Sequence, residues 1–477
     1  MIETASGSVS RSLIAPAFAL IFIAITAVIT MSLTEGETGS LMIAAAAAIG
    51  AYMALNIGAN DVANNVGPAV GSKALSMTGA LIIAAVFETA GALIAGGDVV
   101  GTISKSIIDP TSVADPNVFV LLMMSALISA ALWINIATVV GAPVSTTHSI
   151  VGGVAGAGVA AAGFGAVDWG TMSRIAASWV ISPMLGGIIA AMFLAFIKTM
   201  IIYRDDKIAA ARTWVPVLVA IMAGAFASYL AMKGLKKIIS IELTTALLGG
   251  LGVAVLTWAI SYPLIKRQSE GMDNRNKSLR TLFKIPLIFS AALLSFAHGA
   301  NDVANAIGPL AAIVSTVQSG AVAAKVGIPL WVMLIGAAGI SLGLLMFGPK
   351  LINVVGAQIT KLNPMRAYCV ALSAAITVII ASGLGLPVSS THIAVGAVFG
   401  VGFFREWYTA NSKRRRDYIQ RHAPYKPAKP PVSTDVKKHR RLVRRHHFVT
   451  IIAAWLITVP MAAALSGLLF WGFSTFL

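Results

Sequence analysis

The sequence contains little charge and a single cysteine for its length. Asp, Glu, Lys and Arg make up 11% of its 477 residues, whereas a soluble globular protein carries about a quarter. The one cysteine, Cys369, lies in an apolar run, which excludes a disulfide framework and a cysteine metal cluster. Hydrophobic residues make up 57% of the chain, in continuous rather than alternating stretches, which excludes an outer-membrane barrel. We therefore expect an all-α polytopic membrane protein.

Acidic residues are also scarce, and this sets the expected orientation in the membrane. Lys and Arg number 35 against 18 Asp and Glu, which gives a net charge of +17. The basic residues gather in a few loops, and such loops face the cytoplasm. We expect the N-terminus and the loops 198–212, 266–284 and 405–447 inside, and the acidic loop 32–40 and the C-terminus outside. The loop 233–242 falls outside against its three lysines.

The apolar runs predict about 11–12 membrane segments. The first run, 13–31, has no clear signal-peptide cleavage site, so we expect a retained helix. A second span begins near residue 41. The other apolar stretches are expected near 77–98, 117–141, 143–165, 172–198, 212–232, 244–265, 285–300, 328–348, 366–384, 387–404 and 448–472. This makes thirteen stretches when those that follow the hydroxyl-rich motifs, 143–165 and 387–404, are both counted.

A polar motif occurs twice in this apolar sequence. Residues 58–64 read Gly-Ala-Asn-Asp-Val-Ala-Asn, residues 299–305 repeat the same seven, and Gly-Pro follows shortly after both. An ionised Asp at a bilayer centre costs at least ~3 kcal/mol, so such a residue indicates a functional site. The flanking Gly and Pro can interrupt a helix, and broken half-helices carry the ion sites of secondary transporters. We therefore predict unwound backbone at both motifs.

A hydroxyl-rich motif is also duplicated. Residues 143–148 read Pro-Val-Ser-Thr-Thr-His, and residues 387–392 read Pro-Val-Ser-Ser-Thr-His. Proline after a glycine-containing turn marks the start of a new helix, whose unpaired amides and hydroxyls can bind an oxyanion. The alternative is plain capping of a re-entrant hairpin. The second copy favours the oxyanion site.

The two motifs recur at similar offsets, 302 − 61 = 241 and 387 − 143 = 244, so the halves are predicted to be repeats. The charge pattern gives them opposite orientations, which predicts two inverted-topology repeats with broken helices, re-entrant hairpins and a site at the midplane. The expected division is an extra N-terminal helix and external loop (1–40), the first repeat (41–200), two linking helices and a cytoplasmic loop (201–284), the first part of the second repeat (285–404), the basic loop (405–447) and a last helix (448–477).

The oxygen chemistry of the motifs defines candidate ligands. Hard oxygen atoms suit small hard cations, and Asp and Asn at i, i+3 share a helix face. The alternative for these residues is a structural polar network that ties two helices together. The carboxylates and carboxamides concerned are Asn60, Asp61, Asn64, Asn301, Asp302 and Asn305.

Three further polar residues have no settled role. His148 and His392 either shuttle protons or hold the hairpins by hydrogen bonds, and we favour the structural role. Glu88 is a lone carboxylate in an apolar span, and a cation ligand and a local helix–helix hydrogen bond are equally good interpretations. If Gly91 corresponds to Gly343, the counterpart of Glu88 in the other half is the apolar Ile340.

At these residues the sequence resembles the inorganic phosphate transporter (PiT) family. The resemblance rests on both pairs of motifs and the hydrophilic loop of the second half, and it covers the chain from about residue 41. It implies cation-coupled phosphate symport by two inverted repeats, as a homodimer in the lipid bilayer. The sodium candidates are then Asp61, Asn64, Asp302 and Asn305, with Glu88 added from its own position. The phosphate candidates are Ser145, Thr146, Thr147, Ser389, Ser390, Thr391, Asn60 and Asn301.

We therefore predict a secondary transporter, not an enzyme, that imports inorganic phosphate with sodium across the cytoplasmic membrane by alternating access. No cofactor is expected beyond the co-transported sodium, and no nucleic acid. Proton coupling and sulfate transport by the same fold are alternatives, although hydrogen phosphate can donate a proton to Asp61 or Asp302 and sulfate cannot. A hydrolase using Ser145, His148 and Asp61 is disfavoured because every candidate is duplicated. An anion channel would transport without cation dependence.

Overall fold

A computed structural model describes residues 2–109, 112–113, 115–142, 144–234, 241–322, 327–358, 362–422 and 445–476. Pro143 and most of the basic loop 405–447 therefore lie outside the described residues. Within the described ranges the regular elements are helices, as the composition predicts, with one isolated bridge between Ile108 and Val167. The elements are α1 (Ile2–Leu33), α2 (Ser40–Asn60), α3 (Val62–Gly71), α4 (Met77–Ala95), α5 (Gly97–Lys105), α6 (Pro116–Val140), α7 (Thr146–Ala162), η1 (Phe164–Ala166), α8 (Trp169–Ile197), η2 (Lys198–Ile202), α9 (Lys207–Lys233), α10 (Leu243–Gln268), α11 (Asn276–Leu282), α12 (Lys284–Asp302), α13 (Ala304–Ser319), α14 (Leu330–Gln358), α15 (Pro364–Gly383), α16 (Ser390–Asn411), α17 (Lys413–His422) and α19 (Arg445–Phe476).

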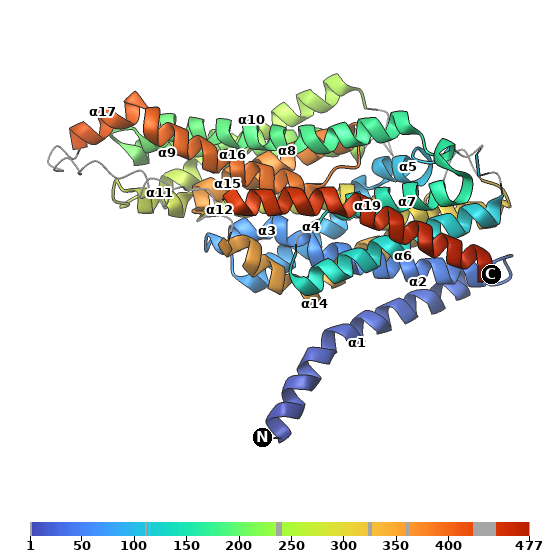
Figure 1. Cartoon of the computed structure of the whole chain (residues 1–477). Helices are drawn as coiled ribbons and strands as arrows, with labels where there is room; N and C mark the ends of the chain where they lie inside the picture. The colour runs from blue at the N-terminus through green and yellow to red at the C-terminus, as the bar shows by residue number, and fades with distance from the viewer. Residues whose placement is uncertain are drawn as a thin grey trace.

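The helices form an elongated bundle, and α1 leaves it at an angle (Figure 1). Eleven of the described helical stretches are long and apolar enough to cross a membrane, which confirms the polytopic class. α7 and α16 correspond to the predicted spans 143–165 and 387–404 but are not among these eleven. In Lys284–Ser319, 89% of the apolar window is buried, against 11% in Leu243–Gln268. α12 and α13 therefore lie at the centre, while α10 presents apolar side chains outward, as a lipid-facing helix does.

Helices of one half pack against helices of the other half. α2 contacts α14, α4 contacts α12, α7 contacts α19, and α8 contacts α16. Small residues permit this close approach. A Cβ at Gly58 would collide with the carbonyl oxygen of Ile340, and a Cβ at Gly299 would collide with that of Glu88. Further glycines in the same role are Gly91 against Phe296, Gly343 against Leu55, Gly152 against Val459 and Gly396 against Pro183.

The predicted unwinding at the Asn-Asp motifs is wrong in extent. α2 ends at Asn60 and α3 begins at Val62, and the intervening Asp61 keeps right-handed helical torsions (φ −87°, ψ −32°). In the second half only Val303 separates α12 from α13, again with right-handed torsions (φ −57°, ψ −32°). Both motifs are interruptions of one residue, so the helices continue through them. Buried packing on all sides offsets the weak helix propensity of Gly and Asn.

Each hydroxyl motif follows a glycine turn. Gly141 ends α6 at φ 76°, and Gly385 follows α15 at φ 68°, a conformation that only glycine adopts without strain. α7 and α16 then begin with Ser145 and Ser389 as N-cap residues. These turns direct both hydroxyl motifs toward the buried Asn-Asp motifs.

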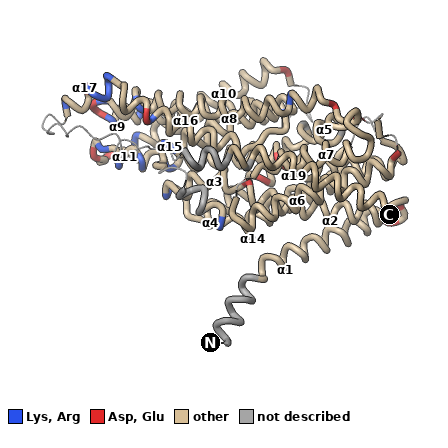
Figure 2. Tube along the Cα trace, in the orientation of Figure 1, with Lys and Arg blue, Asp and Glu red and all other residues tan. Residues whose placement is uncertain are grey.

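Basic side chains gather at one end of the bundle. Figure 2 shows Lys and Arg around α9, α11 and α17, while the C-terminus lies at the opposite end. The connection between α1 and α2 also lies at the end of the C-terminus (Figure 1). The separation of 266–284 from 32–40 agrees with the charge pattern. That the basic end faces the cytoplasm stays a prediction.

Candidate functional site

The two duplicated motifs meet in one buried cluster, and Asp61 receives hydrogen bonds from both halves. Thr146 Oγ1 donates to Asp61 Oδ2 at 2.6 Å, and Thr391 Oγ1 donates to Asp61 Oδ1 at 3.0 Å. Ser390 Oγ donates to Asp302 Oδ2 at 3.1 Å. Hydrogen bonds to charged groups are worth ~1.5–3 kcal/mol each and offset part of the cost of burying the carboxylates.

The second Asn of each motif reaches the hydroxyls of the opposite half. Asn64 Nδ2 donates to Thr391 Oγ1 at 2.9 Å, and Asn305 Nδ2 donates to Thr147 Oγ1 at 3.1 Å and to Thr146 Oγ1 at 3.2 Å. The Oδ1 atom of Asn305 is buried and has no hydrogen-bond partner among the described residues. An unpartnered carboxamide oxygen is the donor type that a hard cation prefers.

The carboxylates of Asp61 and Asp302 lie close together. A carboxylate oxygen of each, with a ring nitrogen of His298, forms a set whose atoms lie within 4.8 Å of one another. Asp61 is 1% exposed, and Asp302 and His298 are fully buried. Two like charges at this separation repel strongly away from water, so the cluster favours a bound cation or proton.

The first Asn of each motif holds the loop before the hydroxyl motif. Asn60 Nδ2 donates to Thr138 Oγ1 at 2.9 Å, and its Oδ1 accepts from the backbone of Val144 at 3.3 Å. Asn301 makes the matching bond to Ser382, at 2.8 Å. The side chains expected to bind phosphate here are therefore engaged in positioning the two hairpins.

The hydroxyls of each motif divide between capping and the cluster. Ser145 Oγ accepts from the backbone N–H of His148, and Ser389 Oγ accepts from that of His392, so both serines cap their helices. Thr147 Oγ1 donates to the carbonyl of Val388 at 3.0 Å. In this arrangement Thr146, Ser390 and Thr391 are the hydroxyls that contact the aspartates.

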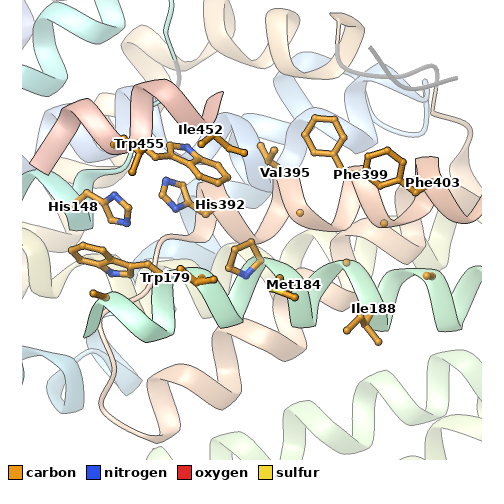
Figure 3. Close-up of a pocket in the computed structure, with 18 of the residues that line it drawn as sticks. His148, Trp179, Met184, Ile188, His392, Val395, Phe399, Phe403, Ile452 and Trp455 are labelled. Carbon is orange, nitrogen blue, oxygen red and sulfur yellow. The ribbon is translucent and has the colours of Figure 1, made fainter. Parts of the chain in front are cut away.

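The two motif histidines pack against each other and against tryptophans. The His148 ring lies 3.8 Å from the Trp179 ring, the His392 ring lies 3.5 Å from the Trp455 ring, and the histidine rings are 4.3 Å apart. Figure 3 shows this stack at one end of a largely apolar cavity of about 980 Å³ between α8, α16 and α19. The structure shows these rings packed against tryptophans instead of making the expected hydrogen bonds, so their role stays a prediction.

Sequence reasoning missed two residues that connect Glu88 to the cluster. His298 Nδ1 lies 2.6 Å from Glu88 Oε2, and His298 Nε2 lies 2.9 Å from Asp302 Oδ2. Asn65 Nδ2 donates to Glu88 Oε1 at 2.7 Å. A sequence signal existed, because a histidine four residues before Asp302 shares its helix face. We call Asn65, Glu88, His298 and Asp302 the relay.

The relay draws residues from both halves, and three of its four members have apolar counterparts at the repeated positions. Gly58 approaches Ile340 as Gly299 approaches Glu88, which supports Ile340 as the counterpart of Glu88. At the offset of 241, the counterpart of His298 is residue 298 − 241 = 57, an isoleucine, and that of Asn65 is residue 65 + 241 = 306, an alanine. The two aspartates therefore have different surroundings, and among the described residues Asp302, but not Asp61, contacts an imidazole.

The arrangement does not form a hydrolase triad. The Ser145 hydroxyl accepts from the backbone of His148, whose ring packs against Trp179 instead of the serine. Asp61 accepts from two threonines instead of orienting an imidazole. A Ser-His-Asp mechanism needs all three groups in hydrogen-bonded sequence.

Comparisons with known proteins agree with this site. Residues 57–466 match the model of the phosphate transporter family. A Helicobacter pylori (strain J99) protein provisionally named phosphate permease is 46% identical, over 98% of this chain and 96% of its own length. The inorganic phosphate transporter 2-1, chloroplastic, of Arabidopsis thaliana is 36% identical, over 90% of this chain and 71% of its own length.

A solved structure extends the likeness to three dimensions. It is described as the sodium-dependent phosphate transporter, and it matches with a TM-score of 0.79 and 34% identity. The match covers 91% of this chain and all of the other. These matched proteins are named as transporters and not as enzymes. The chain therefore belongs to the phosphate transporter family.

Proposed function

We propose that the protein imports inorganic phosphate by sodium-coupled symport. The observation that carries this proposal is the convergence of Asp61 and Asp302 on the hydroxyls of Thr146, Ser390 and Thr391. Carboxylates for cations and hydroxyls for an anion lie within one buried cluster. The names of the relatives, phosphate permease and phosphate transporter, support phosphate as the cargo.

The charges of the cluster favour co-binding of cations with the anion. Hydrogen phosphate is a dianion at neutral pH, and two carboxylates would repel it strongly in a poorly hydrated pocket. Cations bound at Asp61 and Asp302 would neutralise this repulsion and orient the threonine hydroxyls. The neutral oxygens of Asn64 and Asn305 suit sodium, and the solved neighbour is itself named sodium-dependent.

The interlocked packing supports alternating access across the cytoplasmic membrane. α7 and α19 come from different halves, as do α8 and α16, so the hairpin of each half can move with the last helix of the other. Such rigid-body motion around a fixed central site is how repeat transporters expose cargo to each side in turn. Assembly as a homodimer is part of the same proposal and rests on the family resemblance.

Proton coupling is a second candidate, and the relay favours it. A buried imidazole between Glu88 and Asp302 can accept and release a proton at the edge of the cluster. In this case His298 would couple protonation of Asp302 to binding of the anion.

Uptake into proteoliposomes tests the proposal. Radiolabelled phosphate and sulfate are offered separately, with a sodium gradient or a pH gradient imposed alone. We expect phosphate uptake under the sodium gradient and none under the pH gradient. Uptake under the pH gradient in sodium-free buffer would favour the relay mechanism, equal uptake of sulfate would reject phosphate specificity, and uptake without any cation gradient dependence would indicate a channel.

A further inference from the structure

A small polar pocket lies at the basic end of the bundle, apart from the paired motifs. Its volume is about 200 Å³, and four cationic side chains from four elements line it. Lys198 comes from η2, Arg280 from α11, Arg366 from α15 and Arg405 from α16. We call it the four-cation pocket. Its remaining polar lining residues are Tyr203, Asn276, Asn363 and Thr409.

The cations of this pocket lie close enough to act on one another. Lys198 is 8% exposed. The positive charges of Arg366, Arg405 and Arg415 repel its ammonium group. Arg280 and Arg405 act on Arg366 in turn. Like charges in a partly buried site destabilise the fold unless an anion joins them.

Neighbouring side chains among the described residues supply part of the compensation for these charges. Lys198 Nζ lies over the rings of Tyr408 and Phe404, at 4.2 and 5.5 Å from their centroids. Glu406 lies beside Arg405 and acts on its charge. Among the described residues that line the pocket, four are cations and none is a carboxylate, so this lining is positively charged.

We propose that the four-cation pocket binds a phosphoryl anion. Arginine forks match the oxygens of a phosphoryl group, and a buried lysine adds a point charge. The volume is below the ~300–1,000 Å³ of sites for drug-sized ligands, which favours one phosphoryl group over a nucleotide. None of the residues that line the pocket belongs to either duplicated motif, so this site is separate from the transport cluster.

Two sources can supply such an anion at this end of the protein. One is free inorganic phosphate in solution. The other is the headgroup of an anionic phospholipid, and the position of Phe404 makes that route available. Phe404 lies under Lys198 and also lines the apolar cavity of about 980 Å³, so an acyl chain can follow the headgroup into that cavity.

The experiment uses the purified full-length chain in detergent and has two arms. In the first, phosphate binding is measured by equilibrium dialysis in choline buffer, without sodium, so that a sodium-coupled site stays empty. In the second, native mass spectrometry measures retention of phosphatidylglycerol, with phosphatidylcholine as the neutral reference. The variants are Lys198→Gln, Arg280→Gln and Arg366→Gln, and Lys277→Gln is the control because Lys277 is an exposed cation on the same short helix as Arg280.

Loss of one charge-assisted contact should weaken binding by roughly tenfold or more. Weaker phosphate binding in the pocket variants, but not in Lys277→Gln, would support free phosphate as the ligand. Unchanged phosphate binding with selective loss of phosphatidylglycerol would support the lipid headgroup. Retention of both ligands at the level of Lys277→Gln would overturn the proposal. If Lys198→Gln does not fold, the exposed Arg280 gives the decisive variant.

Discussion

His298 lies between Glu88 and Asp302, with its two ring nitrogens 2.6 and 2.9 Å from their carboxylate oxygens. All three side chains are buried, and they come from α4 and α12, which belong to different halves of the chain. The imidazole therefore separates two carboxylates that would otherwise face each other away from water. It also joins the relay to the cluster of hydroxyls and aspartates.

Replacing this imidazole should destabilise the protein. His298→Gln removes the group that bridges Glu88 and Asp302, and breaking a buried charged pair costs ~3–5 kcal/mol. The double variant Glu88→Gln/His298→Gln should recover part of that loss, because one of the two carboxylates is gone. Thermal unfolding in detergent measures both effects. Equal unfolding temperatures for the wild type and His298→Gln would show that the relay contributes little.

Local signals in the sequence predict the helices and the caps well. The expected spans 117–141 and 244–265 correspond to α6 and α10 within a few residues, because apolar length and terminal polar residues act locally. Ser145 and Ser389 likewise cap the helices that their motifs predict. The duplicated motifs also predict which residues form the cluster. Each copy places polar side chains in an apolar span at a high cost in free energy, which indicates that both copies contribute to one site.

Long-range packing explains what the sequence could not predict. Asn60 and Asn64 are chemically identical, yet the helix directs Asn60 toward the loop before α7 and Asn64 toward Thr391. Glu88, which contacts His298, is 210 positions away in the sequence, and no local pattern indicates that pairing. The sequence also does not predict that the helix continues through Asp61, because burial on all sides outweighs the local preference of the Gly-Pro flanks.

The two kinds of hydroxyl should respond differently to substitution. Ser145→Ala removes a helix cap, which costs ~0.5–2 kcal/mol of stability, and should leave the apparent affinity for phosphate nearly unchanged. Thr146→Val removes a donor to Asp61 and should reduce uptake at least tenfold with a smaller effect on unfolding. Unfolding curves and proteoliposome uptake separate the two. If the Ser145→Ala variant folds normally but binds phosphate poorly, then Ser145 is a phosphate ligand and not only a helix cap.

The basic end of the bundle should face the cytoplasm. In a Cys369→Ser background, Thr38→Cys should react with an impermeant thiol reagent from outside intact cells. Lys277→Cys and Lys413→Cys should react only after permeabilisation, because positive loops are retained inside. All three engineered positions are exposed in the structure. Labelling of Thr38→Cys and Lys277→Cys from the same side would contradict the inverted repeats.

Neutralising either aspartate tests whether that carboxylate binds a coupling cation. Asp61→Asn and Asp302→Asn preserve shape, so the proteins should fold, while each loses one charged cation ligand. We expect both variants to lose sodium-driven phosphate uptake, because the dianion then arrives without its cations. From the two carboxylates we expect at least two sodium ions to be transported with each phosphate. The membrane potential would then drive any net positive charge inward, with ~2.3 kcal/mol per elementary charge for each 100 mV.

The control for this experiment is Asp206→Asn, which removes an exposed carboxylate at the N-terminus of α9, far in sequence from both motifs. It should leave sodium-driven uptake near the wild-type rate. Since Asp302, unlike Asp61, contacts His298, Asp302→Asn should also alter the pH dependence of any remaining uptake, whereas Asp61→Asn should not. Full sodium-driven uptake by Asp61→Asn would show that the cation binds elsewhere. Equal pH profiles for both variants would show that the relay takes no part in transport.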